Sequence, residues 1–245
     1  MNRTTKRSLI TLLFAAAGFA PHAVAQDYMG MFNASNTAGI NIAGTIAVNG
    51  AIKKQAKNAS GRAREALSPE ATEALTYTPD ATVSRRVKEE FKTAVQRADP
   101  AKSDHIARVL DAQDVLADFD RDMAPYGFRS NNVADAMSAY WITMWMIANQ
   151  KAIPTRKRVA AVHQQVTRNM LTNQMLAKAT LEQRQEMAEG LVYETMFALG
   201  QRADVERRRD YTRQRELARV AHKNVLRNGI DLKNLRMTSS GFVSN

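Results

Sequence analysis

The chain has 245 residues, a formal net charge of +11 and no cysteine. This length suffices for one domain of ordinary size or for two small ones. The lack of cysteine excludes disulfide bonds and every kind of thiolate chemistry, so the stability of the fold must come from packing.

The first 25 residues have the three-part order of a secretory signal peptide. Basic residues within the first seven positions precede an apolar run over 9–20, and Ala23-Val24-Ala25 supplies a cleavage site. The run is shorter than the ~20 residues of a membrane-spanning helix, although an uncleaved anchor is the alternative. Cleavage after Ala25 removes three cations and no acid, which leaves a net charge of +8. We expect a soluble protein in the periplasm or outside the cell, without a lipid anchor because no cysteine follows.

Residues 26–78 differ in composition from the rest of the chain. They are rich in Asn, Gly and Ala, and the aliphatic residues from Ile40 to Ile52 lie mostly two or four positions apart. Interspersed glycines weaken both a strand and a helix. We predict a flexible arm and linker over 26–78. The alternative is that the alternating aliphatic residues add a strand to the sheet edge of a partner.

From Pro79 onward the apolar residues follow the period of an α-helix, which predicts an all-α, single, bundle-like domain of six or seven helices over 79–236. The apolar stripes and breaks place helices at 83–95, 106–110, 115–119, 133–148, 154–176, 181–199 and 203–228. Pro125 and Gly127 should end the third of these. The fourth is apolar over more than half of its circumference, which is typical of a helix at the centre of a bundle. Residues 237–245 are expected to form a disordered tail.

The turn before the 133–148 helix gathers polar and aromatic residues, which makes it the candidate surface for a ligand or for a side chain of a partner. These residues are Tyr126, Asn132, Asp135, Tyr140 and Trp141. In the alternative reading they have structural roles. Asn132 then caps the helix, Asp135 completes the cap, and the aromatic rings fill the core.

No residue pattern predicts a metal, a cofactor or a catalytic group. The histidines after the signal peptide, His105, His163 and His222, fall in different predicted helices and lack metal-ligand spacing. The alternating aspartates from Asp118 to Asp122 lack the glycine and glutamate of a calcium loop. Glycines 39–50 form neither a dinucleotide fingerprint nor a phosphate loop.

Positive charge is concentrated near the C-terminus. Residues 202–236 contain eleven cations and five acids. The densest part forms a candidate basic surface of Arg207, Arg208, Arg209, Arg213 and Arg215. Such a segment can bind an acidic protein, acidic lipid or nucleic acid, and predicted export makes nucleic acid an unlikely partner. The alternative is a helix whose charges form local ion pairs.

Three groups of residues form a pattern that recurs elsewhere: 76–79 leading into 83–87, 124–128 leading into 132–141, and 228–231 near the end. The central group begins with Ala124-Pro125-Tyr126-Gly127-Phe128. The pattern resembles a family of exported bacterial proteins known only as a domain of unknown function. The resemblance covers about 75–245 and leaves out the arm. It implies export and the domain boundary, but no activity and no binding residues.

Two functions fit these observations. The first is a periplasmic or secreted interaction module that binds another envelope or secreted protein. The second is a cell-envelope hydrolase that works with Asp and Glu side chains, which requires at least two carboxylates to converge in a pocket. The first accounts for the missing catalytic patterns. The sequence leaves the oligomeric state open.

Overall fold

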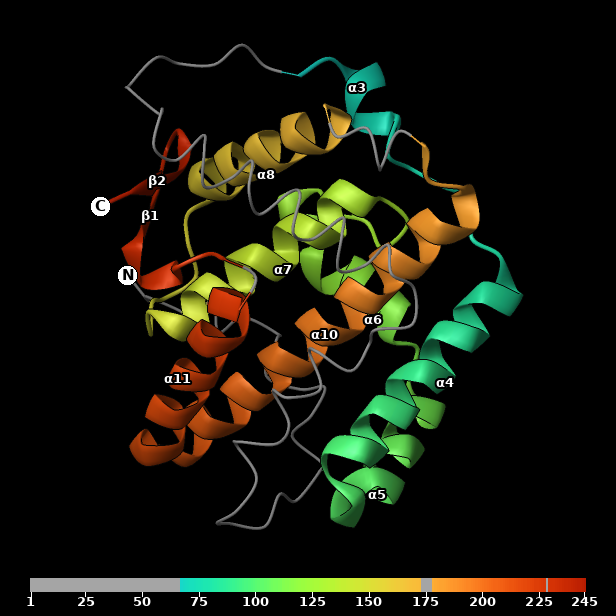
Figure 1. Cartoon of the computed structure of the whole chain (residues 1–245), viewed down its shortest axis with the longest axis vertical. Coiled ribbons are helices and arrows are strands. Elements are labelled where there is room, and N and C mark those ends of the chain that lie inside the picture. Colours follow the sequence, from blue (N-terminus) through green and yellow to red (C-terminus); the bar gives the residue numbers. More distant parts are fainter. Residues whose placement is uncertain (1–66, 173–177, 228) are drawn as a thin grey trace, which may run out of the picture.

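A computed structural model describes residues 67–172, 178–227 and 229–245 (Figure 1). The predicted signal peptide and most of the predicted arm lie outside these residues. The helical fold class is confirmed. The helices are α3 (Pro69–Glu73), α4 (Ala81–Ala98), α5 (Pro100–Ala112), α6 (Val115–Met123), α7 (Val133–Ala148), α8 (Arg156–Leu171), α10 (Leu181–Arg208) and α11 (Tyr211–Arg227). Short 3-10 helices are η3 (Ala124–Tyr126) and η4 (Leu232–Asn234), and the strands are β1 (Leu235–Thr238) and β2 (Gly241–Ser244).

Helix α7 forms the centre of the fold, as its composition predicts. All of its residues are buried. It contacts α8, α10 and α11, so that α8 lies on one side of it and α10 with α11 on the other (Figure 1). A helix that is apolar around most of its circumference must be enclosed in this way, because each exposed face would leave apolar surface in water.

Helices α4 and α5 lie antiparallel to each other, and α4 connects this pair to the core. The predicted stripe of α4, which includes Val87, Phe91 and Val95, is buried. The ring of Phe91 lies 5.3 Å from that of Tyr193 and 5.9 Å from that of Phe197, both on α10. Stacked and edge-to-face aromatic pairs of this kind add to the apolar burial. The pair therefore depends on α10 for its position.

The domain begins earlier than predicted. Leu75 and Tyr77 are buried in the core, although they fall in the segment assigned to the linker. Tyr77 donates its hydroxyl to the Ser130 carbonyl at 3.0 Å, and its backbone N–H to the Asn131 carbonyl at 3.0 Å. These contacts join residues that lie far apart in the chain. No pattern of residues near Pro79 therefore predicts that the segment before it belongs to the core.

The break between the last two long helices also lies further along the chain than predicted. Helix α10 continues through Gly200 to Arg208, and the expected start near residue 203 is wrong. Gly200 costs about 1 kcal/mol of helix propensity, which burial against the core offsets. The break occurs at Arg209, whose φ is +57°, and the Asp210 carboxylate then accepts the Arg213 N–H at the start of α11.

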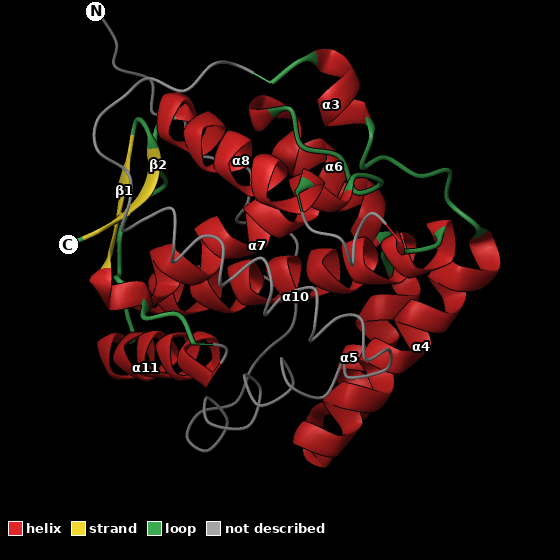
Figure 2. Ribbon diagram, turned by 45° about the horizontal axis from the view of Figure 1, so that its top comes forward, coloured by secondary structure: helices red, strands yellow, loops and turns green. Residues whose placement is uncertain are grey.

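The predicted disordered tail is wrong. Strands β1 and β2 form an antiparallel hairpin in which Met237 pairs with Phe242, and both side chains are buried. The hairpin packs against the side of α8 (Figure 2). The Gln165 side chain of α8 accepts the Phe242 N–H at 2.7 Å and donates to the Phe242 carbonyl at 3.1 Å. At this point the Gln165 side chain thus supplies the hydrogen bonds that a neighbouring strand would otherwise make.

Gly241 is the position at which the hairpin is most sensitive to substitution. Its φ is +102°, and an added Cβ would lie 2.5 Å from the Gln165 Oε1 atom. We expect Gly241→Ala to lower the free energy of unfolding by about 1–3 kcal/mol, because of both backbone strain and the clash. Chemical denaturation measures the change.

Gly190→Ala is the matched control. Gly190 lies within α10, and a Cβ there meets no atom within 4 Å. This variant should be more stable than the parent by up to ~1 kcal/mol. Equal effects of the two substitutions would contradict the proposed packing of the hairpin.

Candidate functional site

The turn between α6 and α7 is held by side chains from both of its ends. Gly127 ends η3 with a φ of +75°. The Asp120 carboxylate accepts the Ser130 N–H at 2.6 Å and the Ser130 hydroxyl at 3.0 Å. These bonds connect α6 to the residues just before α7, so the path of the turn is well defined.

Asn132 and Asp135 stabilise the start of α7. The Asn132 side chain accepts the N–H groups of Ala134 and Asp135 at 2.9 and 3.2 Å, which confirms the predicted helix cap. Asp135 is buried, and its carboxylate accepts the Arg129 N–H at 3.1 Å. The partners and burial of these two residues fit the structural reading of the turn.

Asp135 also contacts His163, for which the sequence predicted no role. The His163 Nε2 atom of α8 lies 2.7 Å from Asp135 Oδ1, and the His163 ring lies tilted against that of Phe128, with 5.3 Å between the ring centres. The pair joins α8 to the start of α7. Thr167 Oγ1 lies 3.4 Å from the same nitrogen and donates its proton to the His163 carbonyl at 2.8 Å.

Of the five residues predicted at the turn, Tyr126 lies at a cavity, and the other four are buried in the fold. Trp141 donates its ring N–H to the Met137 sulfur at 3.1 Å. Tyr140 is buried, and desolvation raises the pKa of its hydroxyl well above the ordinary value, so this hydroxyl stays protonated.

A cavity lies between the end of α6, the turn, α7 and the start of α8; we name it the α7 cavity. Its lining includes Met123, Tyr126, Phe128, Ile142, Ile153 and Val159. Nearly all of the lining is apolar. The volume within which the centre of a water-sized sphere fits is about 40 Å³. One water needs ~10–15 Å³ on this measure, so the cavity matches a few carbon atoms, such as one side chain. Ile153 is 45% exposed and stands at its edge.

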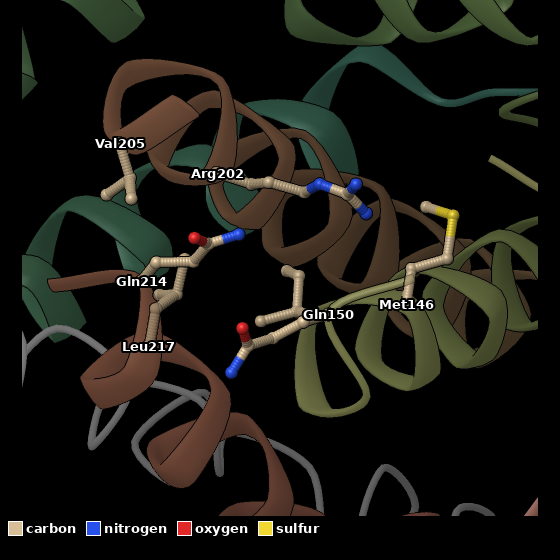
Figure 3. Close-up of a pocket in the computed structure, with 7 residues that line it drawn as sticks. Met146, Gln150, Arg202, Val205, Gln214 and Leu217 are labelled. Atoms are coloured by element: carbon tan, nitrogen blue, oxygen red, sulfur yellow. The ribbon is translucent and has the colours of Figure 1, made fainter. Parts of the chain in front are cut away.

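A second, smaller cavity lies between α7, α10 and α11 (Figure 3). It offers about 10 Å³ on the same measure, close to the minimum for one water molecule. Arg202 extends toward Met146, with Gln214 and Leu217 on the opposite side of the opening. Arg202 Nε donates to Glu206 at 2.7 Å, and its buried Nη1 has no protein acceptor among the described residues. A single water would satisfy Nη1, which gives this cavity a structural role.

The predicted basic surface is divided between two helices. Arg207 and Arg208 lie at the end of α10 and both bind the buried Asp204 carboxylate, at 2.6 and 2.8 Å. Arg209 occupies the break, while Arg213 and Arg215 lie on α11. Local ion pairs take up part of this charge, in line with the structural alternative.

Most acidic residues of the described segments form ion pairs or cap the N-terminus of a helix. Glu182 and Glu186 both pair with Arg86. Arg121 pairs with Asp118 and Asp122. Within these segments, no three side chains of His, Cys, Asp or Glu are arranged to hold a metal ion. The same part of the chain has no helix long and apolar enough to cross a membrane.

The fold and the cavity together define the class of protein. It is a helical domain built around one enclosed helix, with a two-stranded hairpin at one end and a small apolar cavity at the surface. The chain belongs to the family of unknown function DUF6683, which it matches over residues 4–245. The expected family resemblance is confirmed, but the family also covers the arm that the prediction left out. Neither the curated proteins nor the solved structures include a match.

Glu189 is a buried carboxylate between α10 and α4. Its Oε1 accepts the Ser84 hydroxyl at 2.7 Å and the Gln185 amide at 2.8 Å, and its Oε2 has no partner among the described residues. Burial raises the pKa of this carboxyl, although its two hydrogen bonds oppose the shift. The folded state therefore prefers the protonated form, and ionisation costs stability as the pH rises through the raised pKa.

Glu189→Gln should therefore stabilise the protein more at pH 7 than at pH 4. Below the ordinary glutamate pKa of 4.5 the carboxyl is protonated in both states and the cost is absent. The amide retains the Oε1 acceptor, and Ser84 and Gln185 keep their bonds. Urea denaturation at several pH values measures the difference in unfolding free energy. Glu90→Gln, at a half-buried position of α4, is the control, and an equal gain at both pH values for Glu189→Gln would contradict the assignment.

Proposed function

We propose that this protein is exported and acts as an interaction module that binds another envelope or secreted protein at the α7 cavity. The single observation that carries this proposal is an apolar cavity, open to solvent, whose edge holds an exposed isoleucine. Exposed apolar surface beside a pocket is typical of a site that a partner covers. Ile153, 45% exposed, contributes such a surface, and Pro154 and Val159 continue it into the cavity.

The rigid surroundings of the cavity support binding without a large rearrangement. Phe128 packs against the His163 ring, and His163 in turn contacts the buried Asp135. On the facing side, Ile142 belongs to the fully buried α7. A preformed pocket loses little conformational entropy when a side chain of a partner enters it.

The alternative hydrolase requires carboxylates that converge on a cavity. Neither the α7 cavity nor the smaller cavity between α7, α10 and α11 has a carboxylate in its lining. The buried Asp135 contacts His163, and the buried Glu189 contacts Ser84 and Gln185. These contacts favour the interaction module over acid–base catalysis.

Ile153→Asp should strongly weaken partner binding. An aspartate places a charge where an apolar side chain of the partner makes contact, and we expect a loss of at least ~tenfold in affinity. The measurement is recovery of a defined envelope protein on the immobilised chain, followed by titration of that protein.

The matched control is Leu226→Asp. Leu226 is 47% exposed on α11, so it introduces the same charge at similar exposure away from the cavity. Retained binding by Leu226→Asp and lost binding by Ile153→Asp are the expected pair of results. Full binding by Ile153→Asp would remove the α7 cavity from the function.

Export itself rests on residues 1–25, which lie outside the described residues. We expect the exported protein to begin at Gln26, and intact-mass spectrometry of protein from the periplasm or the medium measures this. A chain that lacks residues 2–25 should stay in the cytoplasm. Recovery of the full-length chain from the membrane fraction would instead support the uncleaved anchor.

A further inference from the structure

A cluster of cations lies beside the α7 cavity, outside the basic segment that the sequence analysis singled out. We name it the α8 basic cluster: Lys151, Arg156, Lys157 and Arg158. All of these residues are exposed, and none forms an ion pair within the described residues. The arginines of α10 contrast with them, because Arg207 and Arg208 are neutralised by Asp204.

The chain connects this cluster directly to the cavity. Lys151 precedes Ile153 and Pro154, which line the cavity, and Val159 lines it one turn into α8. Arg156 lies three positions before Val159, on the same side of the helix. Positive charge therefore borders the apolar lining along the start of α8.

The cluster is unfavourable for the isolated domain. The first turn of α8 contains no acidic residue, and Thr155 makes no side-chain capping bond. The N-terminus of a helix already carries partial positive charge, so additional cations there repel it and one another. The acids at the end of α6, Asp118 and Asp122, pair with Arg121. Carboxylates from another molecule would relieve this repulsion.

We propose that the partner is an acidic protein segment, with an apolar side chain that enters the α7 cavity and flanking carboxylates that bind the α8 basic cluster. The inference rests on the proposed function and names the chemistry of the partner. A protein segment fits better than a lipid surface, because the cavity matches one side chain rather than an acyl chain. Ile153 is also the only large, strongly exposed apolar residue of the described segments that lines this cavity, so a membrane-inserting face is missing.

The experiment uses the full chain and two fluorescein-labelled peptides. Both peptides contain a central Leu-Phe, flanked by glutamates in one and by lysines in the other. We expect the glutamate peptide to bind and to shift the amide resonances of Ile153 and Val159, and the lysine peptide to bind at least ~tenfold more weakly. Binding of the glutamate peptide should weaken as salt rises, because exposed charges are screened.

Charge reversal tests the cluster. The double variant Arg156→Glu, Arg158→Glu should bind the glutamate peptide at least ~tenfold more weakly than the parent. The matched control, Arg213→Glu with Arg215→Glu on α11, changes the net charge equally at a distance from the cavity and should retain binding.

Three results would overturn the inference. The peptides could bind equally, or both fail to bind, or the α11 reversal could weaken binding as strongly as the α8 reversal. Binding of the chain to phosphatidylglycerol vesicles that the α8 reversal abolishes, without binding to the glutamate peptide, would identify a lipid surface instead. If Ile153→Asp weakens binding of both peptides equally, the proposed function stands and only the acidic character of the partner falls.

Discussion

The complete burial of α7 is the constraint on which the rest of this structure depends. A helix with Met137, Trp141, Met144 and other large side chains around its whole circumference is stable only when every face is covered. Helices α8, α10 and α11 cover its sides, and the terminal residues complete the enclosure. Trp145 of α7 donates its ring N–H to the Leu235 carbonyl at 2.8 Å, so even the hairpin is tied to this helix. The helical part of the domain is therefore one cooperative core.

Several of the polar groups inside this core are stabilised by a hydrogen-bond or ionic partner. Ser138 donates its hydroxyl to the Ala134 carbonyl within α7. Asp135 lies at the first turn, where the helix dipole favours its charge, and His163 and the Arg129 N–H lie next to its oxygens. Gln165 satisfies both backbone groups of Phe242. A buried polar group without a partner costs about 1–3 kcal/mol, more than the ~0.5–1.5 kcal/mol that one such bond contributes, so these partners keep the polar groups from destabilising the core.

The proposed function follows from a place where side chains of α7 line a cavity that opens to the surface. Between the turn after α6 and the start of α8, Ile142 and Met146 of α7 contribute to the lining of this cavity. Ile153 and the α8 basic cluster lie along the same edge. The proposed site is therefore an opening beside the core, bordered by cations that form no ion pair within the described residues.

The sequence by itself determined the elements with local causes. The stripe through Phe91 predicted α4, Asn132 predicted the cap of α7, and Pro125 with Gly127 predicted the end of α6, because each signal acts within a few residues. Only the tertiary structure decided the hairpin and the position of the α10–α11 break, since both depend on packing between distant segments. It also decided the site: the α7 cavity and the His163–Asp135 pair join residues that lie far apart in the chain. A period of apolar residues specifies which face of a helix is buried, but which side chains meet there depends on how whole helices pack.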